Sequence, residues 1–166
     1  IAVLGLGNWG SAIARLWLLE GHKVKGWTIE QEVYESITMD GMNHKYLPDH
    51  SLDGLEATMH VEDALDGSEI IVLALPSSVI LNVVEDIIQY LRPGHVLLDL
   101  AKGLAPGKRL ISEAIHQMLN DNNMHNPLAI LTGPTIAPEA AGCVMTTALV
   151  ASEDMSFADK LSSTLT

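Results

Sequence analysis

The first ten residues, Ile1-Ala-Val-Leu-Gly-Leu-Gly-Asn-Trp-Gly10, determine how the rest of the chain is interpreted. Four apolar residues typical of a strand run directly into three glycines spaced G-x-G-x-x-G, and a helical pattern follows at once. In such a unit Gly5 permits the turn, Gly7 lets the backbone approach a pyrophosphate, and Gly10 lets the helix pack against the strand. The N–H groups and the dipole of the new helix favour an anion there. The stretch predicts dinucleotide binding; the alternative is a turn with a structural role alone.

Length and composition fit a single α/β domain. The chain has 166 residues, few aromatic residues (4%) and many aliphatic ones, which suits buried parallel strands covered by helices. No apolar run is long enough to span a membrane and no charged-then-apolar leader is present, so we expect a cytoplasmic protein without membrane insertion. Because the sequence starts inside a strand pattern and stops inside a helical one, we expect residues 1–166 to be one domain of a longer protein.

Charged and metal-binding residue types argue against several kinds of partner. The net charge is −12, with nine lysines and arginines in all, whereas a surface that follows a nucleic acid backbone needs clustered cations. We therefore expect no nucleic acid partner. The seven histidines show no zinc-ligand spacing, so we expect no metal site. The single cysteine, Cys143, has no internal disulfide partner, and we expect it to be a small residue of the core.

Strand and helix patterns alternate along the chain. Strands are expected over residues 1–4, 23–27, 55–59, 69–75, 95–100, 127–131 and 144–151. Helices are expected over residues 11–20, 31–42, 79–91, 109–119 and 155–165, with shorter helical turns after residues 61 and 137. The stretch Asn43-His-Lys-Tyr-Leu-Pro48 is expected to be a polar loop that ends at its proline. This order predicts a Rossmann-type α/β fold, a doubly wound and mostly parallel sheet.

Glu30 is the candidate for contact with the adenosine ribose. It lies twenty residues past Gly10, where an acidic side chain can accept hydrogen bonds from the ribose hydroxyls. A carboxylate repels a 2′-phosphate, and no lysine or arginine stands between Thr28 and Lys45, so the sequence favours NAD over NADP. The alternative is that Glu30, with Glu32, only begins the next helix, since first-turn acids are common.

Lys102 is the one cation among the groups expected at the ligand-binding edge. In open sheets of this kind ligands bind beyond the carboxyl ends of the strands, at the switch in strand order. Lys102 follows the strand expected at 95–100, and a glycine comes next. Its ammonium group can pair with a phosphate, or polarise a carbonyl oxygen during hydride addition. The alternative is an ordinary surface lysine.

Other groups at the same edge are less distinctive. Thr132, Gly133 and Thr135 can present hydroxyl and backbone N–H donors to the same ligand, or form a plain turn. The serines before Val79 are expected to cap the helix that follows. Asp99 is a carboxylate in an otherwise apolar strand pattern, and its only expected partner is nearby backbone.

These segments, taken in order, resemble the N-terminal cofactor domain of the NAD-dependent glycerol-3-phosphate dehydrogenases. Residues 5–10 are similar to the glycine turn of that family and residues 43–48 to its characteristic loop. Ala101-Lys-Gly103 is similar to its lysine-glycine segment, and Leu131-Thr-Gly-Pro-Thr-Ile-Ala-Pro-Glu-Ala-Ala141 to its second signature. Four matches spread over the chain make this resemblance far more specific than the glycines alone.

The resemblance implies reversible hydride transfer between NAD(P)H and dihydroxyacetone phosphate, which gives sn-glycerol 3-phosphate for glycerophospholipid synthesis, by a homodimer. It also implies roles for individual residues. The dinucleotide would be contacted by Asn8, Trp9 and Ala137, with Ile29 and Val79 flanking its adenosine and nicotinamide sides. Lys102 would touch substrate and cofactor, and Gly133 and Thr135 would face the substrate.

The chain departs from the family in several respects. The family's proton-donating lysine and its clamp for the substrate phosphate belong to a helical C-terminal domain that this sequence lacks, so we expect residues 1–166 alone to be inactive. Thr28-Ile29 replaces the basic or small residues of many NADPH-using members, and Asp99 replaces a residue that is usually uncharged. Two other readings remain open: a two-domain hydroxyacid or ketopantoate reductase, and a nucleotide-sensing module without catalysis.

Overall fold

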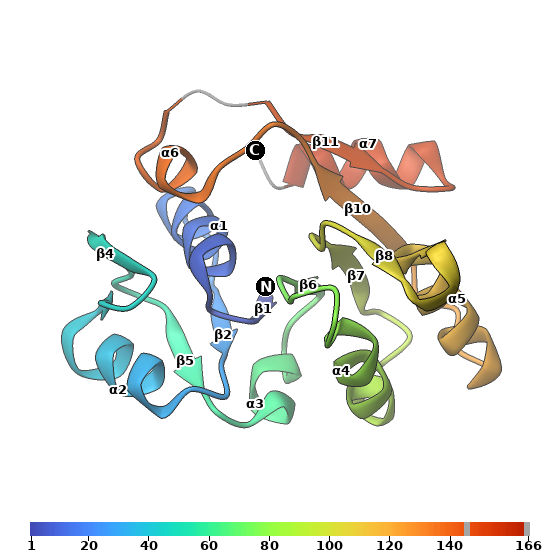
Figure 1. The fold of residues 1–166 in the computed structure, drawn as a ribbon, viewed down its shortest axis with the longest axis horizontal. Coiled ribbons are helices and arrows are strands. Elements are labelled where there is room, and N and C mark those ends of the chain that lie inside the picture. Colours follow the sequence, from blue (N-terminus) through green and yellow to red (C-terminus); the bar gives the residue numbers. More distant parts are fainter. Residues whose placement is uncertain (145–146, 165–166) are drawn as a thin grey trace.

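The computed structural model describes residues 1–144 and 147–164 and has a seven-stranded sheet at its centre (Figure 1). The strand order is β11-β10-β7-β6-β1-β2-β5. All neighbours pair in parallel except β10 and β11, which are antiparallel. The bounds are β1 Ala2–Leu4, β2 Lys25–Trp27, β5 Glu56–Thr58, β6 Ile70–Leu73, β7 Val96–Asp99, β10 Leu128–Thr132 and β11 Leu149–Ala151. The predicted Rossmann-type, mostly parallel sheet is confirmed.

Helices cover both faces of this sheet. Their bounds are α1 Asn8–Leu19, α2 Gln31–Asp40, α3 Val61–Leu65, α4 Ile80–Ile87, α5 Ile111–Asp121, α6 Ala137–Ala141 and α7 Met155–Thr164, with 3₁₀ turns at Ile88–Tyr90 and Pro106–Lys108. Alternate strand residues point to opposite sides, so the core has two parts. Val3, Val72 and Leu98 pack toward α1, α2, α6 and α7, while Leu4 and Leu73 pack toward α3, α4 and α5 (Figure 1).

The central strands are the most apolar part of the chain. All four residues of β6 are buried, as expected for a strand that has a neighbour on each side and helices above and below. β1 is buried throughout as well. These two neighbouring strands separate the first part of the chain, β1 to β5, from the second, β6 to β11. The direction in which successive strands are added reverses between them, which is where this class of sheet binds ligands.

Residues 43–48 are not the polar loop that the sequence predicts. They lie in a two-stranded antiparallel hairpin of β3 (Met42–Asn43) and β4 (Leu47–Ser51). Asn43 and Leu47 are buried, because the hairpin packs its inner side onto α1 and the turn before it. A second small hairpin joins β8 (Leu104–Ala105) to β9 (Arg109–Leu110).

Three further expectations need correction or fall outside the described chain. α1 begins at Asn8, three residues earlier than expected, because Gly7 already has extended backbone and acts as the N-cap. Cys143 is exposed in a left-handed conformation after α6, so its expected place in the core is wrong. The last strand and helix are expected to include Met145, Thr146 and Leu165, which lie outside the described residues. Within 1–144 and 147–164, none of the helices combines the length and apolar character needed to cross a bilayer.

Candidate functional site

The candidate site lies at the carboxyl ends of the parallel strands, where five connecting segments meet. The glycine turn follows β1, and the segment from Thr28 to Glu30 follows β2. Residues 74–79 follow β6, residues 100–103 follow β7, and residues 133–136 follow β10. Because β1 and β6 are neighbours at the switch in strand order, the glycine turn lies at the centre of this edge.

Gly5 permits the turn and Gly10 permits close packing of the helix, as the sequence predicts. Gly5 has φ +101°, a value that side chains rarely allow, and its N–H donates to the carbonyl oxygen of Trp27 at 2.9 Å. A Cβ on Gly10 would collide with the carbonyl oxygen of Gly5 and would lie 3.1 Å from the Cβ of Ala74. A Cβ on Gly7, in contrast, would have no atom within 4 Å, so this side of the turn is open.

The start of α1 offers backbone donors to that open side. The first hydrogen bond of the helix runs from the N–H of Ser11 to the carbonyl oxygen of Gly7, at 2.9 Å. The N–H groups of Asn8, Trp9 and Gly10 precede it, so they have no acceptor within the helix. All three residues are uncharged, and the positive end of the helix dipole adds to the donors. This geometry suits one anionic group such as a pyrophosphate.

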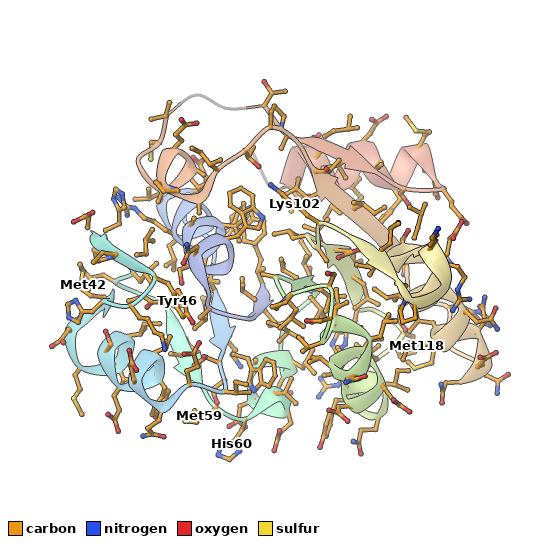
Figure 2. All side chains as sticks on the ribbon, viewed as in Figure 1. Met42, Tyr46, Met59, His60, Lys102 and Met118 are labelled. Atoms are coloured by element: carbon orange, nitrogen blue, oxygen red, sulfur yellow. The ribbon has the colours of Figure 1, made fainter. Side chains whose placement is uncertain are left out.

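Lys102 reaches from the loop after β7 to the start of α1, as Figure 2 shows. Its Nζ lies 5.9 Å from the centroid of the Trp9 ring and donates to the carbonyl oxygen of Thr135 at 3.2 Å. Three segments that are far apart in the sequence therefore meet at one ammonium group. Gly103 keeps this loop close to the loop after β6, since a Cβ there would lie 2.9 Å from the Cβ of Ser77.

Thr135 and Gly133 are held by the protein itself. Thr135 is buried, and its carbonyl oxygen accepts the hydrogen bond from Lys102. A Cβ on Gly133 would lie 2.6 Å from the carbonyl oxygen of Thr147, so the glycine allows close packing against the segment before β11. Ala137 follows at the first position of α6, a helix that packs beside α1 (Figure 1).

Asp99 receives a physical explanation from the structure. It ends β7, is 2% exposed, and its Oδ1 accepts a hydrogen bond from the N–H of Ala101 at 2.8 Å. The expected backbone partner is therefore present. Burial raises the pKa of Asp99, and the hydrogen bond from Ala101 offsets part of this increase. The resulting pKa is about 6. The carboxylate fixes Ala101, the residue directly before Lys102.

Glu30 has two protein partners that the sequence did not predict. Its Oε2 accepts a hydrogen bond from Nζ of Lys45 at 2.6 Å, and its Oε1 accepts one from the hydroxyl of Tyr46 at 2.9 Å. These bonds, that of Lys45 first, lower the pKa of Glu30. The absence of lysine between residues 28 and 45 is therefore a poor guide to cofactor choice, because Lys45 itself contacts the carboxylate.

Two residues that the resemblance assigns to the cofactor lie open to solvent. Ile29, between β2 and α2, is 75% exposed, and Val79, at the N-cap of α4, is 41% exposed. A ligand along the carboxyl edge would cover apolar surface at both positions. The N-cap of α4 is Val79, and no side chain caps this helix, so the expected capping by the serines before Val79 is wrong. The N–H of Val79 donates to the carbonyl oxygen of Pro76 at 3.0 Å.

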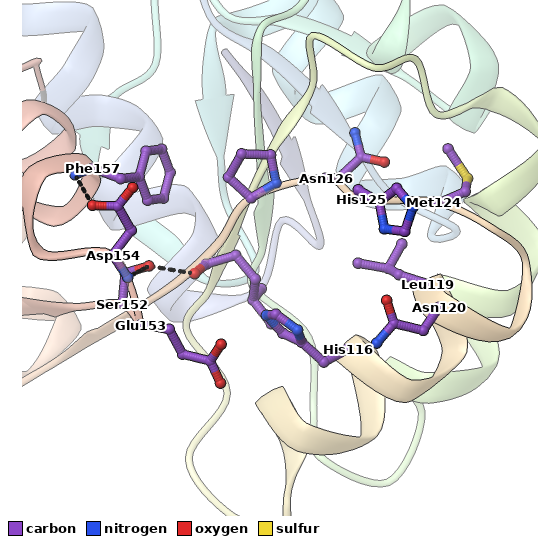
Figure 3. Close-up of a pocket in the computed structure, with 12 residues that line it drawn as sticks. His116, Leu119, Asn120, Met124, His125, Asn126, Ser152, Glu153, Asp154 and Phe157 are labelled. Atoms are coloured by element: carbon purple, nitrogen blue, oxygen red, sulfur yellow. Dashed lines mark hydrogen bonds between the residues drawn. The ribbon is translucent and has the colours of Figure 1, made fainter.

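A separate pocket of about 360 Å³ lies at the other end of the sheet (Figure 3). It is formed where α5 ends, β10 begins and β11 ends, and His116, His125 and Phe157 are part of its lining. Ser152 donates to the carbonyl oxygen of Leu128 at its wall, at 3.0 Å. This pocket faces the amino end of β10, so it does not belong to the edge that holds the glycine turn and Lys102.

A glycine turn at the switch point of a parallel sheet defines a Rossmann-type α/β domain, the class of fold that binds dinucleotides. Residues 1–158 match the model of the family described as NAD-dependent glycerol-3-phosphate dehydrogenase N-terminus. The chain therefore belongs to this family.

Individual relatives agree with this assignment. A glycerol-3-phosphate dehydrogenase (NAD(P)+) of Halothermothrix orenii is 34% identical over 163 residues, covering 97% of this chain and 46% of the relative. One of Acidobacterium capsulatum is 36% identical over 167 residues, covering 97% and 49%. The crystal structure of the glycerol-3-phosphate dehydrogenase from Coxiella burnetii has a TM-score of 0.90 at 29% identity, covering 98% of this chain and 49% of that one. The chain spans about half the length of these relatives.

Proposed function

We propose that residues 1–166 form the cofactor-binding domain of an enzyme that interconverts dihydroxyacetone phosphate and sn-glycerol 3-phosphate with NAD(P)H, for glycerophospholipid synthesis. The observation that carries the proposal is the position of Lys102 beside the first turn of α1, at the switch point, in a chain of this family. The names of the relatives support glycerol 3-phosphate as a substrate and both forms of the cofactor.

The residues at the carboxyl edge fit a bound dinucleotide. The open space at Gly7 and the N–H groups of Asn8, Trp9 and Gly10 suit its pyrophosphate. Glu30 lies where the adenosine ribose is expected, with the exposed Ile29 next to it. When bound, the cofactor supplies or accepts a hydride at its nicotinamide ring, which Val79 and Ala137 would help to place.

Lys102 has the central part in the proposed chemistry. Reduction of a ketone puts negative charge on its oxygen, and an ammonium group within reach stabilises that charge or holds the phosphate of the substrate. The carbonyl oxygen of Thr135 and the ring of Trp9 keep the amine beside the helix start. Thr135 and Gly133 would border the substrate on the side of β10. Asp99 holds the loop of Lys102 through Ala101.

The test is turnover by the whole protein that contains this sequence. NADH or NADPH oxidation is measured with dihydroxyacetone phosphate and, as a comparison, with a panel of 2-oxo acids that includes ketopantoate. We expect turnover with the phosphorylated ketone alone. Equal or faster turnover of an oxo acid would favour a hydroxyacid or ketopantoate reductase, and cofactor binding without turnover of any substrate would favour a nucleotide sensor.

Residues 1–166 by themselves are expected to bind the cofactor weakly and to turn over nothing. Within the described residues, the carboxyl edge offers Lys102 and the Lys45 that pairs with Glu30, which is too little positive charge to hold a phosphate dianion in place. Measurable reduction of dihydroxyacetone phosphate by the purified 166-residue chain would contradict this.

We further propose that the whole protein is a cytoplasmic homodimer. The exposed thiol of Cys143 suits a reducing compartment. Leu149 on β11 and Met155 on α7 are 62% and 68% exposed, so they are available for contact with another chain or with the rest of the same protein. Light scattering of the whole protein measures the assembly; a monomer would contradict the proposal.

A further inference from the structure

Arg15 on α1 connects two segments that lie 36 and 126 residues away from it in the sequence. Its Nη1 donates to the carbonyl oxygen of Ser51 at 3.2 Å, and its Nε donates to the carbonyl oxygen of Ala141 at 3.1 Å. Ser51 ends β4 and Ala141 ends α6, so one half-buried guanidinium group joins α1 to both the hairpin and α6. None of the ion pairs between described residues includes Arg15, so backbone oxygens are the partners of its charge.

The bond to Ala141 completes the C-terminal end of α6. The carbonyl oxygens of Pro138, Glu139 and Ala140 accept from backbone N–H groups just after the helix, whereas that of Ala141 accepts from Arg15. Arginine side chains can bond the last carbonyl groups of a helix and interact favourably with its dipole. Because Ala141 is buried, loss of the guanidinium group would take a donor away from a carbonyl group inside the protein.

Apolar contacts alone position α6 only weakly. α6 packs beside α1, and Ala140 and Ala141 are buried there (Figure 1). An alanine side chain is a single methyl group, and contacts between such groups are individually weak and have little directional preference. A guanidinium group, in contrast, holds its donors in a rigid planar fork. The hydrogen bonds of Arg15 therefore define where α6 lies along α1.

α6 also connects Arg15 to Lys102. Thr135 precedes Ile136, the N-cap of α6, and the carbonyl oxygen of Thr135 accepts from Nζ of Lys102 at 3.2 Å. The helix has five residues, so its ends are about 7.5 Å apart. Lys102 contacts the segment at the start of this short helix, and Arg15 contacts its end. A shift of α6 along α1 would therefore move the acceptor of Lys102 as well.

We propose that Arg15 is a positioning residue for Lys102: its guanidinium group fixes α6 on α1, and α6 places the carbonyl oxygen of Thr135 that Lys102 contacts. The inference rests on the proposed function, since it concerns the proposed chemistry of Lys102. It deepens that function by assigning a part in turnover to an arginine about two turns along α1 from the start of the helix.

The first experiment measures kcat/KM for dihydroxyacetone phosphate and the dissociation constant of NADH, in the whole protein that contains this sequence. Arg15→Met keeps an apolar stem and removes both donors. We expect kcat/KM to fall about tenfold and the affinity for NADH to change by no more than about twofold, since the N–H groups at the start of α1 remain. Arg15→Lys keeps the charge without the fork and should lose about threefold in kcat/KM. Arg92→Met is the control and should change neither value, because Arg92 pairs with Asp66 outside this site.

A double-mutant cycle with Lys102→Ala shows whether Arg15 acts through Lys102. If it does, Arg15→Met should change kcat/KM by less than about twofold in the Lys102→Ala background, because the ammonium group that it places is already absent. An arginine that only stabilises the fold would cause the same loss in both backgrounds. All variants are measured well below the midpoint of their thermal unfolding, so that unfolded protein does not contribute to the loss.

Several results would overturn the inference while the proposed function remains. These are equal losses of kcat/KM in the two backgrounds, no loss in either, or a loss of NADH affinity as large as the loss of kcat/KM. If the wild-type whole protein turns over no substrate, the proposed function fails and the inference fails with it. If Arg15→Met does not fold, Arg15→Lys takes its place in the cycle and the same comparison decides.

Discussion

Asn43 donates a hydrogen bond from its side-chain amide to the carbonyl oxygen of Leu6, at 2.9 Å, and so joins the β3–β4 hairpin to the glycine turn. The same amide nitrogen donates to Oγ of Ser11 at 2.8 Å, and Asn43 is fully buried. The hairpin motif and the glycine motif are therefore one structural unit. Each part of this unit can be tested separately.

Replacement of Asn43 by alanine is expected to lower the free energy of unfolding by about 2–3 kcal/mol, because it removes the donors that face buried oxygens. The loss is measured by urea unfolding followed by circular dichroism. Asn82→Ala on the exposed side of α4 is the matched control and should be neutral or slightly stabilising. A loss below about 0.5 kcal/mol for Asn43→Ala would show that water replaces the amide at little cost.

Alanine at Gly7 and alanine at Gly10 are expected to have opposite consequences. Position 10 has no room, since its Cβ would meet the carbonyl oxygen of Gly5, so Gly10→Ala should destabilise the fold by about 2 kcal/mol or more. Position 7 is open and has φ −74°, so Gly7→Ala should leave stability within about 0.5 kcal/mol.

The affinity for NADH gives a second test of Gly7→Ala. A methyl group on residue 7 would point into the space proposed for the pyrophosphate, so Gly7→Ala should weaken NADH about tenfold or more without unfolding the protein. Titration of NADH together with thermal unfolding checks both parts. Unchanged affinity in Gly7→Ala would place the pyrophosphate elsewhere.

Lys102→Ala is expected to lower kcat/KM for dihydroxyacetone phosphate about a hundredfold or more in the whole protein, because it removes the ammonium group proposed for the ketone oxygen or the phosphate. Stopped-flow oxidation of NADH provides the measurement. Lys23→Ala, at an exposed position before β2, serves as the control and should keep full activity. A nucleotide sensor, in contrast, would keep its response after loss of Lys102.

Asp99 is expected to make the stability of the protein fall as the pH rises. Its ordinary pKa is 3.8, and burial raises the value in the folded protein to about 6. Between these values the folded state holds the proton more tightly than the unfolded state, so stability is lost from about pH 4 to about pH 6. The two-unit shift corresponds to a loss on the order of 2–3 kcal/mol.

Asp99→Asn removes the titrating group and keeps an oxygen that accepts from the N–H of Ala101. The variant should match the wild type near pH 4 and exceed its free energy of unfolding by about 2 kcal/mol at pH 8. Urea unfolding of both proteins across this range gives the difference directly. A difference that stays constant with pH would mean that Asp99 does not titrate there.

Much of the fold follows from local sequence. The apolar run of β6, the glycines after β1 and the alternation of strands with helices depend on residues close together in the chain, so the sheet and its carboxyl edge were predicted correctly. The meeting of Lys102 with the start of α1 follows from the same topology, because parallel strands bring their carboxyl ends to one edge.

Contacts between residues far apart in the sequence account for the features that the sequence did not predict. Polar residues such as Asn43 indicate a loop, and its burial is favourable because its side chain is hydrogen-bonded to the carbonyl oxygen of Leu6, to Oγ of Ser11 and to the N–H of Tyr46. The pairing of Lys45 with Glu30 depends on a hairpin that was not expected. Their separation in the sequence therefore wrongly suggested that Glu30 has no cation nearby. Cys143 was expected in the core from its residue type alone, but it lies in a left-handed turn after a five-residue helix.

The exposed position of Cys143 has a practical consequence. It is the single cysteine of the 166 residues, and it follows α6, whose Ala141 accepts a hydrogen bond from Nε of Arg15 on α1 at 3.1 Å. A thiol-reactive fluorophore would therefore label residues 1–166 at one defined point, close to the helix that carries the glycine turn. Spectroscopic signals from such a label can be assigned to a known place in the molecule without removal of any native residue.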